Sequence, residues 1–129
     1  MVVLDASAAV CLLAERPLGA VERLRARLWD EELHAPHLLD LEVAHALRRF
    51  VLSGELSLER AVAALTDLAN LPLLRHPHAP LLAEIWRMRN NHTAYDTAYV
   101  ALAELLRVPL ITLDARMART PAAVAIEVF

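Results

Sequence analysis

The sequence is poor in several residues on which common sites and folds depend. Its 129 residues include one cysteine, two glycines and no lysine, so that all 13 basic residues are arginines. Two glycines are too few for the glycine-rich loops that cradle nucleotide phosphates. Cys11 lies in an apolar stretch, which indicates a small core residue rather than a nucleophile. The composition therefore excludes nucleotide-binding loops and gives no sign of thiol chemistry.

Long hydrophobic runs and targeting signals are also missing. No apolar run approaches the roughly 18 residues that a membrane-spanning helix requires. Asp5 interrupts the first apolar run early, and no basic residue precedes that run as it would in a secretory signal. We therefore expect a cytoplasmic protein with no membrane partner.

The chain has a surplus of apolar residues, mostly alanine and leucine. The hydrophobic fraction of 57% is above that of an average soluble domain, and it predicts an apolar surface available to a partner such as a second copy. The formal net charge is −3, so charge alone gives no reason to expect nucleic-acid binding.

Apolar segments of strand and helix type alternate along the whole chain. We predict strands at residues 1–4, 33–36, 71–75, 108–113 and 124–128, and helices at 7–14, from Pro17 onward, at 38–52, 57–69, 80–90, 94–106 and 116–119, with a loop at 76–80. Ser57 and Thr93 are expected to cap helix starts, and Gly54 a helix end. Such alternation implies parallel strands joined by right-handed crossovers. We expect a three-layer α/β fold around a parallel sheet of four or five strands, with residues 1–129 forming a single domain.

Two acids follow predicted strands directly. Asp5 ends the first strand and Asp114 ends the strand at 108–113, and a short helix follows each of them. An aspartate in that position is also a preferred helix cap, and for either residue alone the odds are about even. The carboxyl ends of parallel strands lie side by side, where α/β folds build their sites. The pair therefore favours a site.

Two further acids lie on predicted helices with mostly apolar neighbours. Asp96 follows the Thr93 cap by three residues, so it is placed to favour the positive end of the helix dipole. Glu42 lies between Leu41 and Val43, although an exposed helical glutamate is the default expectation. Neither acid indicates a site by itself.

Together the four acids are candidates for a metal site. Two like charges about 4 Å apart repel by roughly 4 kcal/mol at an effective dielectric constant near 20, so such a cluster must hold either protons or a cation. Ligation by carboxylates without paired Cys or His is typical of Mg²⁺ or Mn²⁺. Such a metal activates water for phosphodiester hydrolysis.

Other candidate sites are weaker. The six histidines show no zinc-ligand spacing, and His76 and His78 are assigned to a loop. Ser7 lacks the glycine context of a nucleophile elbow, so we do not expect a catalytic serine.

Four motifs resemble the PIN domain, and specifically the VapC toxins of bacterial toxin–antitoxin pairs. They are Val3-Leu-Asp-Ala-Ser7, the helix segment Leu41–Arg49, Thr93-Ala-Tyr-Asp-Thr-Ala-Tyr-Val-Ala-Leu-Ala-Glu104, and Leu110-Ile-Thr-Leu-Asp-Ala-Arg116, in the family's order across nearly the whole chain. The resemblance implies that Asp5, Glu42, Asp96 and Asp114 are the catalytic, metal-binding acids and that Ser7 and Thr112 are supporting hydroxyls. His45 departs from the family, which often has Asn there.

The resemblance also implies a function and partners. It implies a Mg²⁺-dependent endoribonuclease, with Mn²⁺ as an alternative metal, which cuts structured RNA such as tRNA or rRNA. It further implies a homodimer and a cognate VapB-like antitoxin that inserts a segment over the active site. Two alternatives stay open: an RNA-processing nuclease of the same fold outside any toxin–antitoxin pair, and a PIN-like binding module without catalysis.

Overall fold

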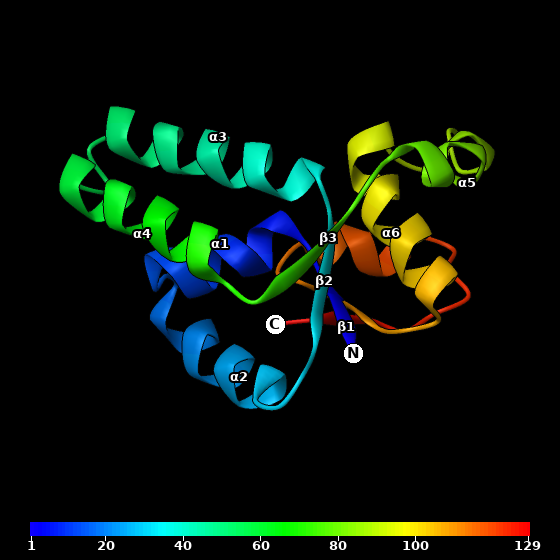
Figure 1. The fold of residues 1–129 in the computed structure, drawn as a ribbon, viewed down its shortest axis with the longest axis horizontal. Helices are drawn as coiled ribbons and strands as arrows, with labels where there is room; N and C mark the ends of the chain where they lie inside the picture. The colour runs from blue at the N-terminus through cyan, green and yellow to red at the C-terminus, as the bar shows by residue number, and fades with distance from the viewer.

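A computed structural model describes all 129 residues and contains one parallel sheet with helices on both faces (Figure 1). Its strands are β1 (Val2–Leu4), β2 (Leu33–Pro36), β3 (Leu73–His76), β4 (Leu110–Thr112) and β5 (Ile126–Val128). They lie in the order β3-β2-β1-β4-β5, and every neighbouring pair is parallel. The predicted three-layer α/β fold with a central parallel sheet is confirmed.

The helices form one larger and one smaller layer. They are α1 (Ala6–Ala14), α2 (Leu18–Leu28), α3 (Leu38–Leu52), α4 (Leu58–Asn70), α5 (Leu82–Arg87) and α6 (Ala94–Leu106), with short 3₁₀ segments η1 (Ala79–Leu81) and η2 (Ala115–Arg119). Helix α1 packs against α2, α3 and α4 on one side of the sheet, and α6 packs with α5 on the other (Figure 1). No helix combines the length and the apolar character needed to cross a membrane.

Two predicted segments differ in the structure. The helix expected at 80–90 begins as the 3₁₀ segment η1, which contains Pro80, continues directly into the six-residue α5 and ends at Arg87. The proline ring has no N–H to donate and suits the start of a helical segment. The loop expected at 76–80 is also partly wrong, because His76 is the last residue of β3 and η1 begins at Ala79.

Helix ends follow the local chemistry of the sequence. Ser57 and Thr93 each accept a hydrogen bond from the backbone N–H three residues later, as expected of N-caps. Helix α3 ends with Gly54 at φ 78°, where the N–H of Gly54 donates to Val51 O and that of Glu55 donates to Phe50 O. This pair of bonds is a Schellman motif, and it needs a left-handed residue at the position of Gly54.

The sheet order places a topological switch between β1 and β4. From β1 the chain adds β2 and then β3 on one side, and it returns to add β4 on the other side of β1. Strand β1 is fully buried, and the Asp5 N–H donates to Ile111 O, which continues the pairing with β4 beyond the strand end. Ligands of open α/β sheets bind outside the carboxyl ends of strands at such a point. Asp5 and Asp114 follow these two strands.

The two glycines of the chain provide a matched test of the Schellman motif after α3. We expect Gly54→Ala to lower the free energy of unfolding by about 1 kcal/mol, because an L-residue is strained at positive φ. A Cβ at Gly19, in α2, meets no strain and no neighbour within 4 Å, so Gly19→Ala should be neutral or stabilising by up to about 1 kcal/mol. Urea unfolding measures both changes. Equal effects of the two substitutions would contradict the Schellman assignment.

Candidate active site at the carboxyl end of the sheet

Asp5 lies at the centre of the site and is almost completely buried, with 7% of its surface exposed. Its Oδ1 accepts hydrogen bonds from Ser7 Oγ at 2.6 Å and from the Ala8 N–H at 2.9 Å, and its Oδ2 accepts one from Thr112 Oγ1. Burial raises the pKa of Asp5 although these donors oppose the rise, and the negative charge of Asp114 raises it further. Asp5 is also the N-cap of α1, so the capping role considered from sequence is real.

Ser7 and Thr112 bind both Asp5 and the chain that follows β4. The Leu113 N–H donates to Ser7 Oγ at 2.8 Å, and the Asp114 N–H donates to Thr112 Oγ1 at 2.9 Å. The two oxygens are 3.3 Å apart. Each hydroxyl thus donates to the Asp5 carboxylate while it accepts from a backbone amide next to Asp114, and this fixes two acid-bearing turns to each other.

The carboxylate of Asp114 forms hydrogen bonds and an ion pair with Arg116. Its carboxylate caps η2 by accepting from the Arg116 N–H at 2.9 Å, and it also contacts the Arg116 guanidinium, with Nε at 3.0 and 3.1 Å and Nη2 at 2.6 Å. This arginine lowers the pKa of Asp114. The Arg116 side chain is 77% exposed, so the guanidinium is held on one side only.

Glu42 on α3 faces Tyr99 on α6. The Tyr99 hydroxyl donates to Glu42 Oε2. Burial raises the pKa of Glu42, the charges of Asp96 and Asp5 raise it further, and the Tyr99 hydrogen bond acts in the opposite direction. Sequence reasoning treated Tyr99 only as part of the apolar surroundings of Asp96. The sequence could have indicated that Tyr99 belongs to the site, because Tyr99 lies three residues after Asp96 and therefore on the same face of the helix.

Asp96 lies in the first turn of α6, where Thr93 caps the helix. The dipole interaction considered from sequence therefore has the geometry it requires. One of its oxygens is 4.0 Å from His92 Nδ1, and the side chain is partly exposed.

The four acids influence one another without forming a closed cage. Asp5 is electrostatically coupled to Asp114 and to Glu42, and Glu42 is coupled to Asp96. No three His, Cys, Asp or Glu side chains are arranged so that they could hold a metal ion. Asp114 is instead turned toward Arg116. The donor chemistry still fits a hard divalent cation, because all four candidates are carboxylates and two have a raised pKa that nearby positive charge would relieve.

Apart from His92, which lies beside Asp96, and His45, the histidines lie in two pairs, His34 with His76 and His37 with His78. His34 Nδ1 lies 2.8 Å from His76 Nε2, and His34 Nε2 lies 2.8 Å from Glu32 Oε1. His78 accepts a hydrogen bond from the Leu38 N–H at the start of α3. These contacts connect β2, β3 and α3. His45 is exposed and has no hydrogen-bond partner.

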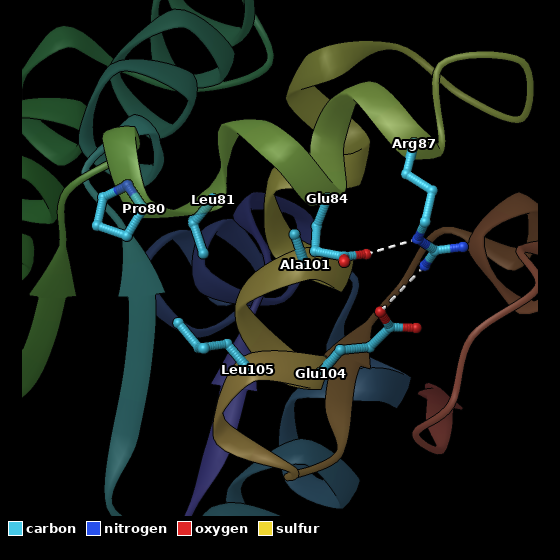
Figure 2. Close-up of a pocket in the computed structure, with 7 residues that line it drawn as sticks. All are labelled: Pro80, Leu81, Glu84, Arg87, Ala101, Glu104 and Leu105. Atoms are coloured by element: carbon cyan, nitrogen blue, oxygen red, sulfur yellow. Dashed lines mark hydrogen bonds and ion pairs between the residues drawn. The ribbon is translucent and has the colours of Figure 1, made fainter.

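A cleft between α5 and α6 contains none of the predicted acids. Its lining residues are Pro80, Leu81, Glu84, Arg87, Ala101, Glu104 and Leu105 (Figure 2). Arg87 lies between Glu84 at 2.7 Å and Glu104 at 3.5 Å, as Figure 2 shows. The Arg87–Glu104 pair links α5 to α6, whereas the Arg87–Glu84 pair lies within α5, and the side chains form a structural contact rather than a catalytic arrangement.

The family model described as "PIN domain" matches residues 2–123. Ribonuclease VapC1 of Mycobacterium tuberculosis is 52% identical over 120 residues, which cover 92% of this chain and 90% of that protein.

Two crystal structures share the fold. Mycobacterium tuberculosis VapC20, described as a sarcin-ricin loop cleaving toxin, gives a TM-score of 0.73 at 15% identity and covers 95% of this chain and 97% of its own. VapBC2 from Rickettsia felis, bound to a DNA fragment from its promoter, gives 0.70 at 15% identity, with 98% of each chain covered.

The raised pKa of Asp5 predicts how the protein's stability depends on pH. Between the ordinary value of 3.8 and the raised value, the folded protein binds more protons at Asp5 than the unfolded chain does. The contribution of Asp5 to the free energy of unfolding therefore falls as pH rises through this window. We expect Asp5→Asn to be more stable than the native protein at pH 7, with the difference shrinking as pH falls toward 3.8. Asparagine is also a good helix cap.

Urea unfolding in EDTA at several pH values between 4 and 8 measures this difference. Asp67→Asn, on the exposed face of α4, is the matched control and should show no such trend. A less stable Asp5→Asn protein at pH 7 would contradict the balance of burial over hydrogen bonding at Asp5.

Proposed function

Because the chain belongs to the PIN-domain family, and within it to the VapC-type ribonucleases, we propose that it is a metal-dependent endoribonuclease toxin. It hydrolyses phosphodiester bonds of structured RNA, such as tRNA or rRNA, in the cytoplasm. The observation that carries the proposal is the acid cluster at the β1–β4 switch point, where Asp5 is buried and held by Ser7 and Thr112. All 129 residues act as one PIN domain.

Asp5, Glu42, Asp96 and Asp114 are the residues that would hold Mg²⁺ or, alternatively, Mn²⁺. When bound, such an ion activates water and stabilises the negative charge that develops on phosphate oxygens. The role of the protein's own residues is to hold these acids in place. Ser7 and Thr112 fix both oxygens of Asp5, and the backbone amides that they accept from fix the turn before Asp114.

Arg116 supplies positive charge beside the acids. Its guanidinium rests on Asp114 and is otherwise exposed to solvent. If Asp114 held the cation, the Arg116 guanidinium would be free to bind a phosphate of the RNA, for which its planar group of donors is well suited. The arginine thereby offsets the repulsion between an acidic site and a polyanion.

The protein partners in this proposal are a VapB-like antitoxin, which covers the site, and a second copy of the chain. The VapBC2 structure supports the antitoxin, since its fold is shared by this chain. Exposed apolar side chains on α3 and α4, namely Leu52, Leu58, Val62 and Leu65, line a groove that suits the apolar face of a protein partner.

Cleavage of total RNA tests the activity. We expect the native protein to cut RNA with Mg²⁺ and to be inactive in EDTA. Asp5→Asn and Asp96→Asn should each lower the rate by on the order of 100-fold or more, because each removes a carboxylate ligand. Asp67→Asn should match the native protein. Equal activity of the site variants and the native protein would refute the assignment of the site.

Expression in bacteria tests the toxin role. We expect the native gene to arrest growth, Asp5→Asn to relieve the arrest, and co-expression of a small gene directly upstream to prevent it. RNA cleavage without growth arrest would instead favour an RNA-processing nuclease. A protein that neither binds Mn²⁺ in calorimetry nor cuts RNA would be a binding module.

A further inference from the structure

Glu42 depends on a single side chain for its position. Asp5 accepts three hydrogen bonds and Asp114 is held by a guanidinium, whereas the one group that donates to the Glu42 carboxylate is the Tyr99 hydroxyl. Glutamate is a flexible side chain that loses considerable rotamer freedom when it is fixed. The orientation of Glu42 is therefore controlled from α6.

Tyr99 is suited to this control because its ring is packed in the core. It is 2% exposed and belongs to the run of buried residues of α6 from Thr97 to Ala103. A tyrosine combines an apolar ring for the core with a hydroxyl that requires a polar partner. Since a phenol is protonated at neutral pH, that hydroxyl donates to the carboxylate.

The Tyr99–Glu42 bond also connects the two helices that carry acids of the site. Glu42 lies on α3, which packs against α1 and α4, and Asp96 lies one turn before Tyr99 on α6, which packs against the sheet and α5. The start of α3 lies near α6 in Figure 1. The hydroxyl thus sets the place of the α3 acid relative to the α6 acid.

We propose that Tyr99 is a positioning residue of the active site, whose hydroxyl holds the Glu42 carboxylate in the orientation used to bind the divalent cation. The proposal rests on the proposed function, since it assumes that Glu42 is a metal ligand. Partners that orient ligands typically change metal affinity by about 10- to 100-fold when they are removed. A tyrosine that served only the core would have no such effect after loss of the hydroxyl alone.

Mn²⁺ binding without RNA, measured by the EPR signal of the free ion, tests the proposal in Tyr99→Phe. The variant keeps the ring and loses the hydroxyl. We expect its Mn²⁺ affinity to fall by about 10- to 100-fold and the Mg²⁺ concentration for half-maximal cleavage to rise by a similar factor. The KM for RNA at saturating Mg²⁺ should stay within about twofold of the native value. Tyr95→Phe is the matched control, because Tyr95 lies on the same helix with 62% of its surface exposed.

A double-mutant cycle shows whether Tyr99 acts through Glu42. In a Glu42→Gln background, Tyr99→Phe should cause no further loss of Mn²⁺ affinity. Glu42→Asp keeps the charge and shortens the side chain away from the hydroxyl, so it should lose affinity as Tyr99→Phe does. Because this variant also moves the proposed ligand itself, the test of Tyr99 is that Tyr99→Phe adds no further loss of Mn²⁺ affinity in the Glu42→Asp background.

The possible results are distinct. Native-like Mn²⁺ affinity in Tyr99→Phe, or an undiminished effect of Tyr99→Phe in the Glu42→Gln or Glu42→Asp background, would overturn the role of Tyr99 and leave the proposed function intact. A native protein that neither binds Mn²⁺ nor cuts RNA would overturn both.

Discussion

A carboxylate buried at the end of β1 is the constraint on which the site depends. An ionised group without water must be stabilised by protein donors, because desolvation otherwise favours the protonated form. Asp5 receives these donors from its own helix and from two hydroxyls, one of which lies on β4. The same hydroxyls accept from the backbone before Asp114. Stabilising one charge therefore also fixes how β1, α1 and the turn after β4 meet.

The four acids have different partners, and this gives them different properties. Asp5 is buried with hydroxyls, Glu42 faces a phenol, and Asp114 faces a guanidinium, so that burial raises two pKa values while Arg116 lowers the third. Repulsion among the acids is balanced locally by these partners. A divalent cation held by the cluster would replace Arg116 at Asp114, and the guanidinium would then be available to an RNA phosphate, as the proposed function requires.

Much of the fold could be predicted from local sequence. The alternation of apolar strands and helices predicted a parallel sheet of four or five strands, and the structure has five. The bounds of α3 and β2 agree with prediction because proline and glycine mark their ends. Ser57 and Thr93 cap helices through contacts three residues away, which spacing reveals. The helix predicted at 80–90 extended too far, because the buried residues Leu81, Ile85 and Met88 have helical spacing whereas α5 ends at Arg87.

By itself the sequence determined that Asp5 and Asp114 lie close together, since both follow buried strands of one parallel sheet and a strand's carboxyl end is set by chain direction. Helical spacing likewise placed Asp96 and Tyr99 on one face. Only the tertiary structure decided the partners that Asp5 and Glu42 find far along the chain. Thr112 meets Asp5 across 107 positions of the chain, and Tyr99 meets Glu42 across 57. Such contacts depend on the relative placement of whole elements, and local propensity and periodicity carry no information about that placement.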